Sequence, residues 1–462
     1  MFKLLTNPLI TSWANSILGL LGFLLVVPIA SNHLSDPQFT LWLFANSIIA
    51  VGILFESAVS VVFTRTLTAY IERRSISRND CFQAANDKVA VFISTSLILY
   101  LVVGLIGGLT AYLAGVYSID GLISIGLDPA EAHQTLLALG AIACSSILLS
   151  FGRSVLIANQ QMRVQRSSML ITTIGKLLVS VTIFSVIPRV DYAMAAITLV
   201  NVLEILFLTV LSWKVQRLAL RSRPNLRVMD EFAVPFVKTF LIRIGGYLAM
   251  YSSSVIIVRY APTNADAYLL SFRLVQAAAS VSMIPVSISL PALTRLRVRI
   301  EADQQPVSAF VDAALRIIAF GLSCMLFMLL GLLLLGPWML EIATSDKTLL
   351  EPAALAYLCL IFFLESHHVA HSMVYETQNR VPFLAISIVS GVVILGLSML
   401  LVPHFGIWGG LVTLNLVQIS GNNWFPVWLN LRQWGMSWTV YLRFVVRMLL
   451  HPSPSKIINS DA

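Results

Sequence analysis

The hydrophobic positions of this chain fall in long, unbroken runs. Residues 20–30 read LLGFLLVVPIA and residues 320–336 read FGLSCMLFMLLGLLLLG, and comparable runs recur along nearly the whole sequence. A helix needs roughly 20 apolar residues to cross the hydrocarbon of a bilayer. Strands of a membrane barrel would instead alternate apolar and polar residues in segments of about 10. The pattern predicts an all-α polytopic membrane protein and excludes a β-barrel.

Glycine, proline and clustered charges divide these runs into about twelve spans. The first six lie near residues 8–30, 39–64, 86–114, 133–157, 168–187 and 193–213, and the other six near 233–258, 267–293, 309–336, 353–376, 382–402 and 407–429. We expect four parts in the chain. They are an N-terminal six-helix bundle (1–213), a cytoplasmic linker (214–231), a C-terminal six-helix bundle (232–430), and a cytoplasmic interfacial helix with a polar tail (431–462).

Composition supports a membrane protein, because 58% of the 462 residues are hydrophobic and only 11% are charged. The net charge of +8 does not indicate nucleic-acid binding, since the basic residues gather in alternate loops. These include Arg73 and Arg74, Arg153 with Arg163 and Arg166, Arg217 to Arg227, and Arg295 to Arg299. Cytoplasmic loops carry such an excess, so both termini are expected in the cytoplasm of a bacterial cell, with the chain in its inner membrane.

The two halves show weak internal similarity. Asp36 and Thr64-Arg65 recur 230 positions later as Asp266 and Thr294-Arg295, and Arg163-Val164 recurs 217 positions later as Arg380-Val381. Two halves of six spans with the same orientation predict parallel repeats about an axis along the membrane normal. Transporters of that plan bind substrate near the middle of the membrane, between the halves.

Several basic residues lie inside the predicted spans, where a charge costs a few kcal/mol unless it faces protein or water. Lys238 and Arg243 fall in the seventh span and Arg273 in the eighth, without a local acidic partner. Lys238 is close enough to the end of its span to extend toward the interface. A guanidinium offers a planar set of donors that suits phosphate, so these residues are candidates for binding an anionic substrate group.

Other charged residues in the spans have two interpretations. Lys176 and Glu204 lie at similar depth in adjacent spans, so they either neutralise each other or serve the substrate and the coupling step. Asp312 and Arg316 are four residues apart, which favours a local ion pair. Glu56 and Glu365 are each candidates for binding substrate, a coupling cation or a proton.

The segment ESHHVAHS places His367 and His371 four residues apart, and His368 three residues after Glu365. The glutamate of an HExxH motif is missing, so core hydrogen bonding or proton-linked gating is favoured over a metal site. The four cysteines have no CxxC spacing, and no cofactor fingerprint or Walker-type motif occurs. We therefore expect no cofactor, no metal and no catalytic residues.

The start of the chain, ILGLLGFLLVVPIASNHLSDPQFTLWLFANSIIAVGILFESAVSVVFTRTLTAYIERR, resembles the bacterial polysaccharide transporter family. This family comprises O-antigen-type flippases of the multidrug/oligosaccharidyl-lipid/polysaccharide (MOP) superfamily. The resemblance is carried by a first span ending near Pro28, a polar turn with Asp36, and an acidic residue, Glu56, followed by small residues and Arg65.

The resemblance implies two six-helix bundles that move a polyprenyl-pyrophosphate-linked oligosaccharide outward by alternating access. It further implies that Lys238, Arg243 and Arg273 contact the pyrophosphate. Their positions inside the spans make Lys176 and Glu56 further candidates for the cavity, and Glu365, His368 and Glu204 candidates for coupling or gating. Implied partners are the lipid-linked oligosaccharide, membrane lipids, and glycan polymerases or glycosyltransferases, with no nucleic acid. The first span carries no charge, so the anion site is expected to lean toward the second half.

Three alternatives remain at this point. A cation-coupled multidrug exporter of the same superfamily would use acidic residues such as Glu56, Glu204 and Glu365 to hold cationic drugs. A major-facilitator permease would carry a GxxxDRxGRR-like loop after its second span, where this chain has YIERRSISRND. A membrane glycan polymerase or ligase would need a large periplasmic loop with catalytic side chains, and the outward loops here are short.

Overall fold

The computed structural model describes residues 8–76, 79–212, 217, 222–225, 230–301, 306–344, 346–378 and 382–450. Within these residues every regular element is a helix, which confirms the predicted all-α class. The polar tail, most of the linker 214–231 and the repeat at Arg380-Val381 lie outside the described residues.

The helices divide between two compact units, Met1–Asp266 and Ala267–Ala462. The first unit holds α2 (Pro8–His33), α3 (Asp36–Ile76), α4 (Asn79–Ser124), α5 (Pro129–Ala158), α6 (Met162–Val186), α7 (Val190–Leu211), α9 (Asp230–Tyr260) and the short η2 (Pro262–Asn264). The second holds α10 (Ala265–Ser282, from Ala267), α11 (Ile284–Glu301), α12 (Val307–Ala343), α13 (Pro352–Glu376), α14 (Leu384–Phe405), α15 (Ile407–Val417), η3 (Gln418–Asn422), α16 (Trp424–Trp434) and α17 (Trp438–Leu450).

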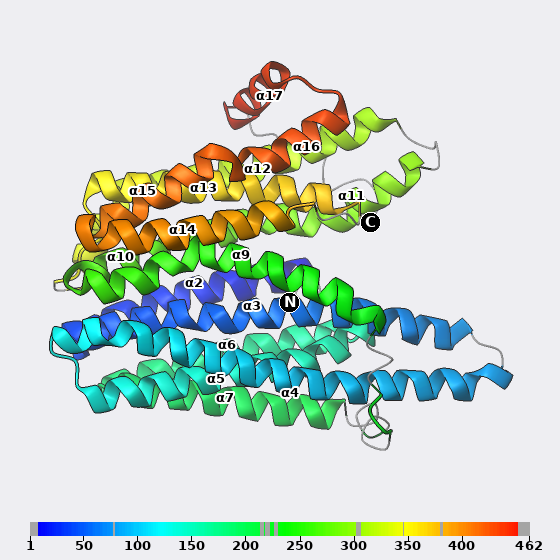
Figure 1. The fold of residues 1–462 in the computed structure, drawn as a ribbon, viewed down its shortest axis with the longest axis horizontal. Coiled ribbons are helices and arrows are strands. Elements are labelled where there is room, and N and C mark those ends of the chain that lie inside the picture. The colour runs from blue at the N-terminus through cyan, green and yellow to red at the C-terminus, as the bar shows by residue number, and fades with distance from the viewer. Residues whose placement is uncertain are drawn as a thin grey trace. The chain divides into compact units, whose positions relative to one another are not determined.

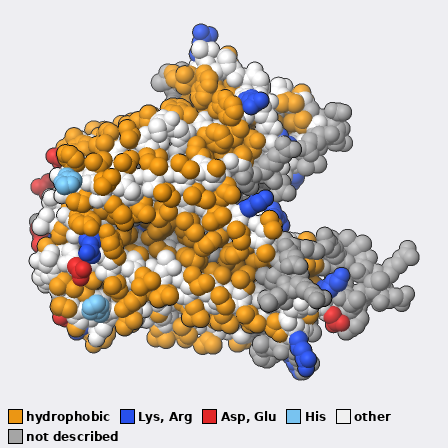
Figure 2. All heavy atoms as spheres, in the orientation of Figure 1, with side chains coloured by type: hydrophobic (Ala, Val, Ile, Leu, Met, Phe, Trp, Pro, Cys, Tyr) orange, Lys and Arg blue, Asp and Glu red, His pale blue; other side chains and the backbone are white. Residues whose placement is uncertain are grey.

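Ten helical stretches of the described chain are long and apolar enough to cross a membrane. They account for ten of the twelve predicted spans, and the chain is a multi-pass membrane protein. The first predicted span corresponds to α2, whose described apolar part, Ile17–His33, is shorter, and the last is divided into α15, η3 and α16. Figure 2 shows the expected surface, with hydrophobic side chains over most of the visible face and charged ones toward its edges.

One predicted span, residues 267–293, is interrupted. The structure has α10 ending at Ser282 and α11 beginning at Ile284, and the two helices belong to one membrane-spanning stretch, Pro262–Arg297. Pro285 lies in the first turn of α11. Proline lacks a backbone N–H and is tolerated in a first turn, where that donor would have no helical acceptor. The break at Met283 therefore follows from the proline.

In the first unit, α3 packs against α4, α5 and α9, while α5 also packs against α4 and α7, and α2 packs against α6 (Figure 1). The sequence predicted α9 to begin the C-terminal bundle. By compactness α9 belongs with the first unit, because it contacts α3 and α4. The proposed repeat boundary at residues 214–231 stays a prediction.

Glycines allow the helices of the first unit to approach closely. A Cβ at Gly108 of α4 would lie 2.7 Å from the carbonyl oxygen of Gly140 on α5, and one at Gly52 of α3 would lie 3.0 Å from the Cα of Ala143. Small residues at such contacts are typical of membrane helices, because association there depends on van der Waals packing.

In the second unit, α13 contacts α11, α12, α15, η3 and α16, so it is the helix around which this unit is organised. The C-terminal half of α13 joins a buried apolar cluster with α11 and α12. The cluster contains Val286, Leu293, Phe310, Ala314, Ile317, Ile318, Leu322, Ala370 and Val374.

The contact between α4 and α5 gives a stability prediction. Replacing Gly108 with alanine puts a methyl group against a backbone oxygen that cannot move aside, so we expect a loss of about 1–3 kcal/mol in the free energy of unfolding. Thermal unfolding of the purified protein in detergent measures this. Gly396→Ala in α14 is the matched control, since a Cβ there has nothing within 4 Å. Equal melting temperatures for the two variants would contradict the prediction.

Candidate functional site

The two cations predicted in the seventh span lie on α9, and both side chains are exposed. Neither Lys238 nor Arg243 makes a hydrogen bond or ion pair with a described residue. Residues five positions apart on a helix are separated by about 7.5 Å along the axis and about 140° around it. Lys238 and Arg243 therefore share the helix without sharing a face.

The surroundings of Arg243 are mainly aromatic. On a helix, Phe240 and Tyr247 lie on the same side as Arg243, at spacings of three and four residues. Phe240 packs on Phe55 of α3 with ring centroids 5.0 Å apart, and Tyr247 stacks on Tyr251 at 5.2 Å. This face of α9 supplies no carboxylate to the Arg243 guanidinium.

Arg259, near the end of the same helix, shows what a partnered arginine looks like in this unit. Its guanidinium contacts Asp120 of α4 at 3.3 Å and lies over the ring of Tyr117, 4.6 Å from the centroid. It also donates to the backbone oxygen of Tyr117. Arg259 thus connects α9 to α4, whereas Arg243 makes no hydrogen bond or ion pair of this kind with a described residue.

Arg273, the third predicted cation, lies on α10 in the second unit and is half-buried. Its Nη1 donates to the side-chain oxygen of Gln276 at a distance of 2.9 Å, one turn further along the helix. This amide orients the guanidinium. Arg243 belongs to the first unit and Arg273 to the second.

A second group of charges lies inside the first unit, where α5, α6 and α7 meet. Arg153 of α5 holds both carboxylate oxygens of Glu204 on α7, with Nε and Nη2 donating over 2.8–3.0 Å. Ser168 of α6 donates to the same carboxylate at 2.7 Å. Both charged side chains are largely buried, 16% and 3% exposed. Paired donors of this kind are among the strongest hydrogen bonds in proteins.

Glu56 of α3 and Lys176 of α6 complete this group. Each interacts electrostatically with the other and with both members of the Arg153–Glu204 pair, and neither the Glu56 carboxylate nor the Lys176 ammonium has a hydrogen bond to a described residue. Two carboxylates and two cations sum to zero formal charge. We call Glu56, Arg153, Lys176 and Glu204 the charge cluster of the first unit.

The structure corrects the position of Arg153. From the charge pattern of the sequence it was expected in the cytoplasmic loop after the fourth span, but α5 continues to Ala158, so Arg153 lies inside the helix. The hydrogen bonds of Glu204 therefore go to Arg153 and Ser168, and Lys176 acts on it only at longer range. The expected local pair of Asp312 and Arg316 is confirmed, with 2.8 Å between the charged atoms.

The second unit holds a different polar arrangement around the turn η3, which has the hydrogen bond of a π-helix from the N–H of Asn423 to the oxygen of Gln418. Such turns often occur at functional sites. Gln418 donates to Glu365 of α13 at 2.6 Å, and Asn422 donates to Gln418 at 3.1 Å. Two of the three predicted coupling or gating residues, Glu365 and His368, thus face this turn, since His368 Nδ1 also lies 2.7 Å from the backbone oxygen of Asn422.

The other two histidines of α13 contact one tyrosine of α17. The Nε2 atoms of His367 and His371 lie 2.6 and 2.8 Å from the hydroxyl of Tyr441. Asn430 of α16 donates to the backbone oxygen and to Nδ1 of His371, which leaves the His371 proton on Nε2 to be donated to Tyr441. The histidines are engaged in core hydrogen bonds, as expected, and the described residues contain no cluster of three metal-ligating side chains.

Several of these partners were not identified from the sequence. Arg153 had a visible signal, because apolar residues continue after it to Ala158. The amides of the last spans had a weaker one, which is their repetition within an apolar stretch: Asn415, Gln418, Asn422, Asn423 and Asn430. Tyr441 gave no signal, since its partners are about 70 positions away along the chain.

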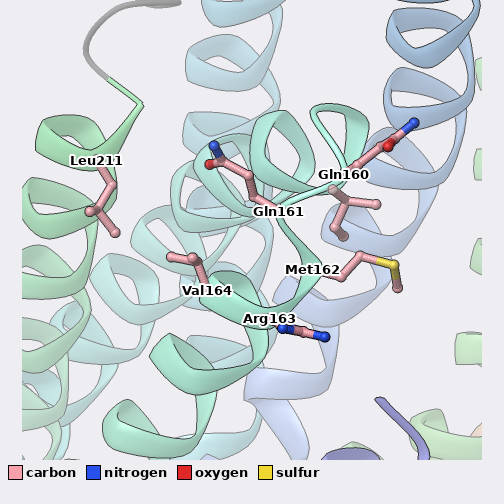
Figure 3. Close-up of a pocket in the computed structure, with 7 residues that line it drawn as sticks. Gln160, Gln161, Met162, Arg163, Val164 and Leu211 are labelled. Atoms are coloured by element: carbon pink, nitrogen blue, oxygen red, sulfur yellow. The ribbon is translucent and has the colours of Figure 1, made fainter. Parts of the chain in front are cut away.

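One hollow of the described surface lies away from all the predicted site residues. It has a volume of about 610 Å³ at the turn between α5 and α6, with Leu211 of α7 beside it (Figure 3). Gln160 has a left-handed backbone (φ 61°), and the N–H groups of Gln160 and Gln161 bond back to Ile157 and Leu156, which ends α5. Arg163 is the one charged residue in its lining.

Comparison with known proteins supports the fold. No protein-family model and no curated protein sequence matches the chain. Solved structures do match it over most of their length. The inward-facing conformation of a multidrug resistance MATE family transporter of the MOP superfamily has a TM-score of 0.70 at 16% identity, covering 90% of this chain and 98% of that one. The chain therefore has the fold of the MATE transporters.

Two further structures agree. A MATE protein in complex with MaD3S has a TM-score of 0.57 at 18% identity, covering 93% of this chain and 97% of that one. A MOP superfamily transporter from Pyrococcus furiosus, described as having a binding pocket of reverse polarity that suggests a different function, has a TM-score of 0.54 at 14% identity, covering 93% and 98%.

The charge cluster can be tested by removing one partner and then both. Arg153→Leu leaves Glu204 buried without its cation, and we expect a loss of about 3–5 kcal/mol in the free energy of unfolding. The double variant Arg153→Leu/Glu204→Leu should recover a large part of this loss. Thermal or denaturant unfolding in detergent measures both values.

Asp312→Asn is the control for that experiment, because it breaks an ion pair in which both side chains are partly exposed. Such a pair contributes about 0–1 kcal/mol. If Arg153→Leu costs no more than Asp312→Asn, the Arg153–Glu204 pair is not the buried structural element described above.

Proposed function

We propose that this protein is a transporter that moves a polyprenyl-pyrophosphate-linked oligosaccharide across the cytoplasmic membrane by alternating access, for export of a cell-surface polysaccharide. The observation that carries the proposal is Arg243, an exposed guanidinium on a membrane-spanning helix with no carboxylate partner among the described residues. The MATE fold of the chain supports a transporter.

The energetic argument concerns the cost of that charge. A charged side chain in the middle of a span is unfavourable by a few kcal/mol, and it is found where protein, water or substrate can compensate. Arg153 and Arg259 are compensated by Glu204 and Asp120. An anionic substrate group would compensate Arg243 in the same way, and a pyrophosphate presents the oxygen acceptors that a guanidinium binds in pairs.

Two other cations extend this proposal. Lys238 adds a second positive charge on α9, with a flexible stem that suits a mobile lipid headgroup. Arg273 of the second unit has its guanidinium oriented by Gln276. We infer that each contacts the phosphate groups at some stage of transport. The transporter of reverse pocket polarity from Pyrococcus furiosus supports the idea that pocket charge varies within this superfamily.

The first functional prediction concerns Arg243. In cells that depend on this protein for a surface polysaccharide, Arg243→Ala should reduce glycan display about tenfold or more, because hydrogen bonds to charged groups contribute about 1.5–3 kcal/mol. Arg243→Lys should keep part of the display, since it retains the charge but loses the paired donors. Display is measured by glycan staining, with the amount of protein in the membrane measured alongside.

Arg163→Ala is the matched control for this experiment, because Arg163 is also an exposed arginine of the first unit but lies at the turn between two helices. It should leave display unchanged. Full glycan display by Arg243→Ala at normal protein levels would remove Arg243 from the substrate site and would withdraw the observation on which the proposal depends.

A second candidate function is cation-coupled multidrug export. It is favoured by Glu56, a carboxylate of a membrane-spanning helix with no hydrogen bond to a described residue, and by the multidrug resistance protein among the structural neighbours. This function predicts that expression raises resistance to cationic drugs and that Glu56→Gln abolishes the increase. A rise in drug resistance on expression, with unchanged glycan display, would favour this function over the flippase.

A further inference from the structure

The C-terminal helix α17 presents three chemically different faces. The inner face packs on the second unit. Tyr441 is 1% exposed, and it joins a buried cluster with Val311 and Leu315 of α12 and Val427 and Leu431 of α16. Phe444 and Val445 pack against the same cluster. The helix is therefore attached along one side, with its other two sides open.

The second face is an exposed apolar stripe. Trp438, Leu442 and Val446 follow one another at four-residue spacing and are 37%, 50% and 54% exposed. Thirteen residues of helix extend about 20 Å, which is too short for a hydrocarbon layer of about 30 Å. A short helix with an apolar side of this kind lies along the membrane interface.

The third face is cationic. Arg443 and Arg447 are one helical turn apart, both are exposed, and they adjoin the apolar stripe. No described carboxylate pairs with either. The same end of the second unit carries further arginines on α11 and α16, namely Arg295, Arg297, Arg299 and Arg432. The neighbouring carboxylate of Asp312 is already paired with Arg316. This end is complementary in charge to an anionic lipid surface.

The inner face also makes a polar connection to α13 through Tyr441. His371 donates its Nε2 proton to the hydroxyl oxygen over 2.8 Å, and the hydroxyl in turn donates to Nε2 of His367 over 2.6 Å. His367 can then donate from Nδ1 to the side-chain oxygen of Asn423 at 3.2 Å. Burial raises the pKa of Tyr441 above its ordinary value, so the hydroxyl keeps the proton that this chain requires.

Moving α17 away from the unit would break both hydrogen bonds of that hydroxyl. It would also leave two buried histidine nitrogens without partners, which is unfavourable because a buried polar atom without a hydrogen bond keeps its full desolvation penalty. The position of α17 is therefore coupled to the structure of α13, the helix that also carries Glu365 and His368.

We propose that α17 binds the anionic phospholipid surface through Arg443 and Arg447 while Trp438, Leu442 and Val446 enter the lipid, and that Tyr441 transmits this contact to α13. The bilayer is the occupant that fits, because it supplies acyl chains and phosphate groups side by side, in the same arrangement as the apolar stripe and the two arginines. Anionic lipid then stabilises the second unit from outside the spans.

The test uses the full-length protein in neutral detergent, titrated with dioctanoyl phosphatidylglycerol or with dioctanoyl phosphatidylcholine. Native mass spectrometry counts bound lipid, and thermal unfolding reports stabilisation. The wild-type protein should retain more of the anionic lipid and melt several degrees higher in it. Arg443→Gln/Arg447→Gln should lose most of this preference, and Arg163→Gln/Arg223→Gln, which removes two exposed arginines of the first unit, should keep it.

Tyr441→Phe separates binding from transmission. This variant keeps the ring in the apolar cluster and removes only the hydroxyl, so it should bind the anionic lipid as well as the wild type and gain less thermal stability from it. A full lipid preference in the Arg443→Gln/Arg447→Gln variant, or an equal loss in the control pair, overturns the proposed binding surface. An undiminished stabilisation of Tyr441→Phe overturns the transmission through its hydroxyl. Neither readout depends on the transported substrate.

Discussion

A charge inside a hydrocarbon layer must be compensated, and this constraint governs the polar part of the structure. The first unit meets it in two ways. Arg153 and Glu204 compensate each other across α5 and α7, with Ser168 as a third partner. Arg243 of α9 is exposed and lacks any described partner, which leaves compensation to water or to a ligand. The buried pair contributes to structure, and the exposed guanidinium is available for function.

The same constraint explains how much the sequence could predict. A charged residue within an apolar run can be recognised from the sequence alone. The candidates identified in this way include Lys176, Glu204, Lys238, Arg243 and Arg273. Their partners were harder to identify, because a partner lies across a helix contact rather than along the chain. The local pair Asp312–Arg316 was predicted correctly, since four residues bring two side chains together on any helix. The pair Arg153–Glu204 spans 51 positions and depends on how α5 packs against α7.

The fold class followed from run length alone, while its irregular parts did not. The break at Met283 and the π-helical turn at Gln418–Asn422 interrupt runs that read as continuous spans. Pro285 accounts for the break, and the turn lies in a segment rich in amide side chains. Glu365 of α13 accepts from the Gln418 amide, and His368 contacts the backbone oxygen of Asn422, so both partners are neutral. The polar groups around α13 are thus paired with amides, a backbone oxygen and a phenol, whereas the charge cluster of the first unit pairs opposite charges.

These arrangements place α3 at a central position in the first unit. Phe55 packs on Phe240 of α9, one helical turn before Arg243, and the next residue of α3, Glu56, belongs to the charge cluster with Arg153, Lys176 and Glu204. Because the cluster sums to zero charge, a proton or cation bound at Glu56 would leave it with a net positive charge. Glu204 is held by three donors and Glu56 by no hydrogen bond from a described residue, so Glu56 is the carboxylate that a proton or cation reaches without breaking such a bond. Phe55, which precedes Glu56, contacts Phe240 of α9, so adjacent residues of one helix connect the acidic group to the helix that carries Arg243.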